Sequence, residues 1–317
     1  MMRWVVLALC VAACRAAPIP PERRFPAGTG FTPRQIEIDG TSIRYLDAGR
    51  GPPVVFLHGL GASMYAWRGA LRPVADAGFR VIAFDNRGFG FSGKPRQGYS
   101  NDDYVRLLRG LLDSLGVGEA ILVGHSMGGQ IAAEFALAHP ARVRALALVA
   151  AAGFGIRVPV LLRAARWPIV GSLASGLRWR WVTGRVLRST YADPSRVTAD
   201  DVDQYYAPVA EPDYAGVVRG VLRGYRFDAL PGRLSALRVP ALVLWGDHDR
   251  WIPPVIGRRL AAEIERVAFI VMPGAGHALQ EEAPDRFNQI LLEYLRHGLP
   301  RIPEDLALSA PTPRLVN

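Results

Sequence analysis

A serine between glycines is the residue of this chain best suited to covalent chemistry. Ser126 lies in Gly124-His125-Ser126-Met127-Gly128-Gly129, after the apolar, strand-like run 121–123 and before a helical stretch over 131–139. A strand, a sharp turn and a helix around a serine form a nucleophile elbow, where small neighbours permit the tight turn and leave the hydroxyl exposed. The pattern predicts Ser126 as a nucleophile at a helix N-terminus.

Two further polar clusters follow apolar runs later in the chain. Gly246-Asp247-His248-Asp249 comes after 240–245, and Gly274-Ala275-Gly276-His277 comes after 267–272. A serine hydroxyl is a weak nucleophile until a base removes its proton. An imidazole can be that base near neutral pH, and a carboxylate can hold it in the required tautomer. We expect the three clusters to meet at one rim of a single sheet.

The surrounding sequence alternates buried strands with helices, which predicts an α/β fold with a mostly parallel sheet and helices on both faces. Residues 35–47 form a hairpin pattern around Asp39-Gly40. The further strands expected are 53–57, 80–85, 121–123, 143–151, 240–245 and 267–272, and the helices are 102–115, 131–139, 254–264 and 284–297.

In this order the motifs resemble those of the α/β-hydrolase superfamily, over roughly 35–297. His58-Gly59-Leu60-Gly61 is similar to its oxyanion loop, and Asp85-Asn86-Arg87-Gly88-Phe89-Gly90-Phe91-Ser92 is similar to its D-x-R-G-x-G-x-S turn. The glycine-flanked serine resembles its elbow. The segment from Trp245 to Pro253 and the one ending at His277 resemble those that carry the acid and the base.

The resemblance implies a catalytic triad of Ser126, Asp249 and His277, in the chain order of this fold. Asp247 is the alternative acid. The spacing between Asp249 and Pro253 matches the family and favours Asp249, which leaves Asp247 as a turn or capping carboxylate.

The resemblance also implies an oxyanion hole made of the backbone N–H groups of Leu60 and Met127. His58 is then expected to brace its own loop. His125 is expected to be a packed or hydrogen-bonded turn residue rather than a base, because an elbow points adjacent side chains in different directions.

The N-terminus resembles an export signal. A short positive start precedes the apolar run 4–13, which is too short to span a bilayer. The run ends in Val11-Ala12-Ala13-Cys14, which resembles a bacterial lipobox. We therefore predict an exported lipoprotein that associates with the membrane through lipidated Cys14. The alternative is a secretory signal cleaved near Ala17. Because Cys10 and Cys14 are the only cysteines, the folded domain has no structural disulfide.

Residues 153–232 interrupt the strand pattern and are rich in arginine and aromatic residues, which predicts a mainly helical lid above Ser126. The predicted organisation is a signal peptide over 1–17, a proline-rich tether over 18–34, core over 35–152, the lid over 153–232, core over 233–298 and a loosely ordered tail over 299–317.

Charge and composition do not point to another class of partner. The formal net charge is +10, but no nucleic-acid motif or compact basic block accompanies it, so we expect no nucleic-acid partner. The stretch 88–93 fits G-x-G-x-x-G, but Lys94-Pro95 follows where a dinucleotide site needs a helix. The histidines show no metal-ligand spacing. We expect neither a cofactor nor a metal.

The serine at the elbow argues against epoxide opening and dehalogenation, for which family members use an aspartate there. The resemblance implies acyl transfer, with a carboxylic ester as the expected small-molecule substrate and a lipid-derived, monoacylglycerol-like ester as one form of it. The alternatives are a carbon–carbon bond hydrolase, a cofactor-free haloperoxidase-like enzyme, and a non-catalytic relative that binds a ligand.

Overall fold

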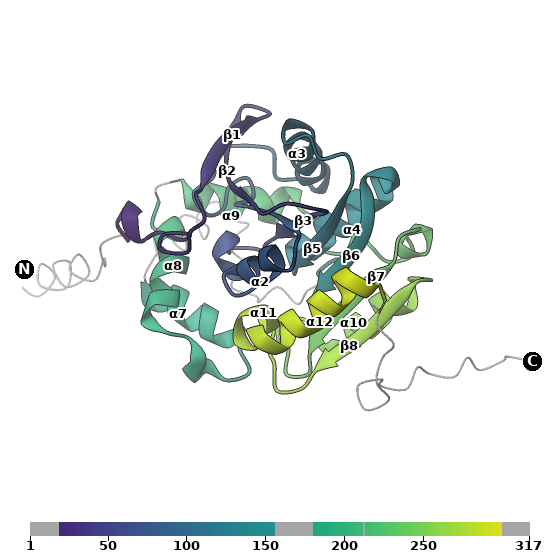
Figure 1. Ribbon diagram of the computed structural model, residues 1–317. Coiled ribbons are helices and arrows are strands. Elements are labelled where there is room, and N and C mark those ends of the chain that lie inside the picture. The colour runs from purple at the N-terminus through teal and green to yellow at the C-terminus, as the bar shows by residue number, and fades with distance from the viewer. Residues whose placement is uncertain (1–18, 156–179, 212, 300–317) are drawn as a thin grey trace, which may run out of the picture.

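An eight-stranded, mostly parallel sheet organises the described part of the chain, which comprises residues 19–155, 180–211 and 213–299 of the computed structural model (Figure 1). The strands are β1 (Arg34–Ile38), β2 (Thr41–Ala48), β3 (Pro53–Leu57), β4 (Arg80–Phe84), β5 (Ala120–His125), β6 (Val143–Val149), β7 (Ala241–Gly246) and β8 (Val267–Met272). Their order in the sheet is β1-β2-β4-β3-β5-β6-β7-β8.

Only β1 and β2 depart from the parallel arrangement. They form the predicted hairpin, with positive φ angles of 47° at Asp39 and 68° at Gly40, and β2 pairs antiparallel with β4. All other neighbours are parallel. Every residue of β5 is buried, as expected of a central strand covered on both faces. The predicted α/β class is confirmed.

The helices of the described ranges are α2 (Leu71–Asp76), α3 (Asn101–Ser114), α4 (Met127–Ala138), α7 (Arg180–Ser189), α8 (Ala199–Val209), α9 (Tyr214–Gly224), α10 (Pro254–Ala262), α11 (Leu279–Glu282) and α12 (Pro284–His297). Short 3-10 helices include η1 (Pro21–Arg23) and η2 (Met64–Trp67). Helix α4 packs on β3, β5 and β6, which fixes the direction in which it leaves the elbow, and α10 packs on β7 and β8.

Helices α7, α8 and α9 lie between β6 and β7 in the chain, within the predicted insertion. Helix α8 begins with a capping box, in which Thr198 accepts from the N–H of Asp201 and Asp201 accepts from the N–H of Thr198. Residues 156–179 fall outside the described ranges. A lid over Ser126 therefore stays a prediction.

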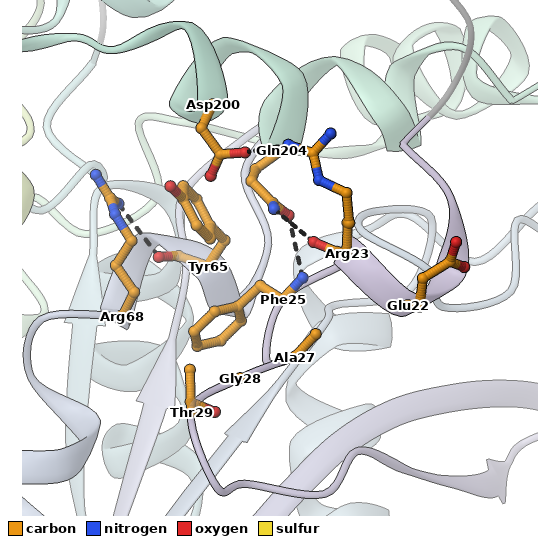
Figure 2. Close-up of a pocket in the computed structure, with 10 residues that line it drawn as sticks. All are labelled: Glu22, Arg23, Phe25, Ala27, Gly28, Thr29, Tyr65, Arg68, Asp200 and Gln204. Atoms are coloured by element: carbon orange, nitrogen blue, oxygen red, sulfur yellow. Dashed lines mark hydrogen bonds and ion pairs between the residues drawn. The ribbon is translucent and has the colours of Figure 1, made fainter.

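Residues 19–33 were expected to form part of an extended tether, but they fold against the domain instead. Phe25 is buried and packs edge-on against Tyr65 of η2, with ring centroids 5.5 Å apart. Its N–H donates to Gln204 of α8, and the amide of Gln204 donates to the carbonyl of Arg23 (Figure 2). These residues border an open pocket of about 480 Å³ on the molecular surface. The segment therefore links α8 to the core.

The predicted export signal and Cys14 lie outside the described residues, as does the tail over 300–317. Within the described ranges, no helix combines the length and the apolar character needed to cross a bilayer.

The tightness of the turn after β5 can be tested by adding one methyl group. A Cβ at Gly124 would lie 2.4 Å from the carbonyl oxygen of Gly128, which is backbone and cannot rotate away. We expect Gly124→Ala to lower the free energy of unfolding by about 1–3 kcal/mol. Thermal or urea unfolding measures the change. Gly118→Ala is the control, because a Cβ there meets no atom within 4 Å, and it should change stability by less than about 0.5 kcal/mol.

Candidate active site

Ser126 occupies a strained turn between β5 and α4. Its φ of 52° and ψ of −118° are unusual for a residue other than glycine. Its N–H donates to the carbonyl of Val149 on β6 at 2.9 Å, and its carbonyl accepts from Ala152 and Gly129. These backbone bonds hold the turn. The hydroxyl of Ser126 has no hydrogen-bond partner among the described residues. This geometry is that of the predicted elbow.

The structure places His277 and Asp249 in direct contact. Nδ1 of His277 lies 2.8 Å from Oδ2 of Asp249, and both side chains are almost fully buried. The other carboxylate oxygen accepts from the N–H groups of Trp251 and Ile252, each at 2.8 Å. Because Asp249 is fixed by its own loop, it orients the imidazole and leaves Nε2 as the nitrogen available for proton transfer. The Trp251 ring lies nearly parallel to the imidazole, with centroids 6.0 Å apart.

Asp247, the alternative acid, has a different role. Its Oδ1 accepts from the N–H of Gly274 at 2.8 Å and lies 2.6 Å from Nδ1 of His248. It therefore joins the turn after β7 to the turn after β8. The structure brings Asp249, and not Asp247, to His277.

His125 joins the elbow to the loop that carries His277. Its Nε2 lies 3.0 Å from the carbonyl oxygen of His277, and the two rings have centroids 4.8 Å apart. Burial, and the nearby His277, hold the pKa of His125 well below its usual value of 6.5. The ring is therefore neutral, and Nε2 must carry the proton that it donates to the carbonyl.

The Ser126 hydroxyl and the His277 imidazole are not hydrogen-bonded to each other in this structure. Catalytic hydrogen bonds of this kind commonly form only when substrate is bound.

The loop that carries Leu60 is fixed by His58. Nε2 of His58 accepts from the N–H of Asn86 at 2.9 Å, so Nδ1 carries the proton and donates to the carbonyl of Gly59 at 2.8 Å. Burial lowers the pKa of His58, which keeps the ring neutral. A Cβ on Gly59 would lie 3.1 Å from the Cβ of Ser126, so this loop runs directly beside the nucleophile.

The N–H groups of Leu60 and Met127 remain available to an oxyanion. Met127 is the first residue of α4, where N–H groups lack helical partners. Neither N–H donates to any acceptor in the described part of the chain. Met127 directly follows Ser126, and Leu60 directly follows Gly59, whose backbone lies beside Ser126. An oxyanion hole needs donors on such segments next to the nucleophile. Their catalytic role stays a prediction.

The segment 88–93 is a loop, as expected, since α3 begins only at Asn101. Among the described residues, no group of three or more histidine, cysteine, aspartate or glutamate side chains could hold a metal ion.

Sequence reasoning overlooked Glu282, a buried carboxylate five positions after His277 in the chain. The sequence carried no local signal for it, because Glu281 and Glu282 stand side by side and only the fold shows which groups each of them meets.

Comparison with known proteins agrees with this geometry. A family model of the α/β hydrolase fold matches residues 52–284. The chain is a member of the α/β-hydrolase family. It is 34% identical over 284 residues to the 2-hydroxy-6-oxononadienedioate/2-hydroxy-6-oxononatrienedioate hydrolase of Burkholderia vietnamiensis, covering 81% of this chain and 93% of that protein.

Two solved structures also resemble this α/β hydrolase. The meta-cleavage product hydrolase from Pseudomonas fluorescens IP01 has a TM-score of 0.73 and 29% identity, covering 83% of this chain and 97% of that chain. A membrane phospholipase A, described as a bacterial virulence factor, has a TM-score of 0.73 and 26% identity, covering 92% of each chain. The chain is thus similar both to a meta-cleavage product hydrolase and to a phospholipase.

Replacing Asp249 tests its pairing with His277. Asp249→Asn retains the shape of the side chain but removes the charge that fixes the imidazole tautomer, so we expect kcat to fall by about 10³–10⁴. Asp247→Asn is the matched control, since its carboxylate serves only the two turns, and it should retain kcat within about tenfold. Steady-state kinetics of both variants, with unfolding curves, measure the difference. Equal losses would contradict the assignment.

The burial of His125 predicts a pH dependence of stability. Below its ordinary pKa of 6.5, the unfolded chain takes up a proton on His125 that the folded protein does not accept until much lower pH. Stability is therefore lost as pH falls below about 6.5, by at most about 1.4 kcal/mol per pH unit. His125→Gln keeps an N–H donor and removes this titration. Between pH 7.5 and 5.5, the free energy of unfolding of this variant should therefore fall by about 1 kcal/mol less than that of the wild type. Urea unfolding at the two pH values tests this. The same pH dependence in both proteins would refute it.

Proposed function

We propose that this α/β hydrolase cleaves a carbon–carbon bond next to a ketone in a 2-hydroxy-6-oxo-dienoate, the kind of compound for which its curated relative is named. The observation that carries the proposal is the hydrogen bond between Nδ1 of His277 and Oδ2 of Asp249, at 2.8 Å, beside the elbow of Ser126. The chain that contains this pair aligns along 93% of that relative. Most of the relatives favour the alternative of carbon–carbon bond hydrolysis over the carboxylic ester that the sequence favoured.

The residues of the site can supply each step of this reaction. His277 removes the proton of Ser126 as its oxygen attacks the ketone carbon, and Asp249 stabilises the imidazolium that results. The N–H groups of Leu60 and Met127 bind the negative charge that develops on the ketone oxygen. As the carbonyl re-forms, the adjacent carbon–carbon bond breaks. Water activated by His277 then hydrolyses the acyl-serine ester.

The carbon leaving group restricts the substrate. An ester releases an alkoxide, whereas carbon–carbon cleavage leaves an electron pair on carbon that must be delocalised. In the 2,6-diketo tautomer of the proposed substrate, the C3=C4 double bond conjugates this pair with the C2 ketone to form an enolate. The enolate then takes up the proton held by His277. A simple ketone without this conjugation is therefore not expected to react.

A second candidate is a lipid-derived ester, which the similarity to a membrane phospholipase A favours. The serine, base and oxyanion donors required for ester hydrolysis are the same. The two candidate reactions therefore differ in the leaving group and in the shape of the substrate that the pocket must accept.

Direct kinetic comparison separates the two candidates. We expect the purified protein to bleach the coloured dienoate substrate with a higher kcat/KM than it shows for p-nitrophenyl esters or monoacylglycerols. Ser126→Ala should lower kcat for the dienoate at least about a thousandfold, because the nucleophile is lost. If esters are hydrolysed and the dienoate is left intact, the ester candidate replaces the proposal.

A further inference from the structure

Glu282 holds together two segments that are far apart in the chain. This residue is 3% exposed and lies at the end of α11. Oε2 accepts from the N–H of Gly276 at 2.7 Å and from the N–H of Ala192 at 3.0 Å, while Oε1 accepts from the N–H of Asp193 at 2.8 Å. No arginine, lysine or histidine of the described ranges forms an ion pair with this carboxylate. The three N–H groups are what compensate its buried charge.

One donor belongs to the loop of the catalytic base. Gly276 directly precedes His277, whose imidazole is fixed by Asp249. The other two donors, Ala192 and Asp193, follow α7 in the chain segment between β6 and β7. The carboxylate therefore bridges the base loop and that segment.

The two segments are also in close backbone contact. The N–H of Ala278 donates to the carbonyl of Thr190 at 3.1 Å. A Cβ on Gly276 would lie only 2.5 Å from the same carbonyl oxygen. His277 thus lies in a loop whose residues on both sides are packed against 190–193, with Glu282 closing the contact.

We propose that Glu282 is a positioning residue for the base, which sets the placement of His277 relative to Ser126 and couples it to the segment around Ala192. The inference rests on the proposed function, in which His277 is the base. Its consequence is that a shift of residues 190–193, for example when substrate enters, moves the loop that holds His277.

An amide cannot replace this carboxylate. A glutamine at position 282 has one acceptor oxygen, and its NH₂ group can only donate. At least one of the three hydrogen bonds would therefore be lost, and the NH₂ group would face a backbone N–H with no acceptor between them. The volume of the side chain is nearly unchanged. Glu282→Gln therefore perturbs the base loop with little effect on packing.

Glu281 provides a matched control on the same helix. Its carboxylate is also buried at the interface with the β6–β7 segment, where it accepts from the Tyr205 hydroxyl at 2.6 Å and pairs with Arg68. The carboxylate of Glu281 makes no hydrogen bond to the loop 274–278. Glu281→Gln therefore weakens the same interface without touching the loop of His277.

The experiment compares the labelling rate of Ser126 by a small fluorophosphonate in the full-length wild type, Glu282→Gln and Glu281→Gln, with kcat, KM and unfolding curves for each. A small probe needs the serine and the base but not a shaped substrate pocket. We expect Glu282→Gln to lower the labelling rate and kcat by about 10- to 100-fold with KM little changed, because misplacing a catalytic group by about 1 Å costs this much. Glu281→Gln should label within a few-fold of the wild type.

Each other outcome has a defined meaning. An unchanged labelling rate in Glu282→Gln, or equal losses in both variants, would overturn the positioning role. If Glu282→Gln does not fold, Glu282→Asp decides in the same way, since its shorter side chain keeps the charge but cannot reach all three donors. Absence of labelling in the wild type would instead refute the proposed serine chemistry itself.

Discussion

The hydrogen bond between His277 and Asp249 is the contact on which the site depends. It joins a residue after β8 to a residue after β7, and it forms because neighbouring parallel strands end at the same edge of the sheet. The acid is held by two N–H groups of its own loop, so the imidazole has a single orientation with Nε2 directed away from the carboxylate. The remaining parts of the site are arranged around this fixed ring.

The nucleophile reaches the same edge through backbone contacts rather than side-chain contacts. The turn at Ser126 is kept at a positive φ by hydrogen bonds to β6 and to the residues after it, and glycines leave the space for β3 and α4 to approach. The neutral rings of His58 and His125 complete the arrangement. One fixes the loop of Leu60, and the other connects the elbow to the backbone of His277. Burial keeps both rings uncharged, so these contacts do not depend on pH near neutrality.

The chain between β6 and β7 is attached to the site by buried charges. Glu281 and Glu282 are adjacent on α11 and both bind groups of this segment, one through Tyr205 and the other through Ala192 and Asp193. Burying charge is costly unless hydrogen bonds compensate it. Such contacts are therefore specific in geometry, and they place residues 190–193 directly against the loop of His277.

Local sequence patterns were enough to predict the strand–helix alternation, the Asp39-Gly40 hairpin and the elbow around Ser126, because buried strands and tight turns leave local patterns of apolar residues and glycine. The sequence also favoured Asp249 over Asp247, through the spacing to Pro253. Two contacts became visible only in the folded chain: residues 19–33 pack onto α8, and Glu282 binds the N–H of nearby Gly276 together with those of distant Ala192 and Asp193. Apart from the bond between Glu282 and nearby Gly276, these contacts join residues separated by about 90 to 180 positions in the chain. No local pattern encodes which distant partner a carboxylate or a backbone N–H will meet.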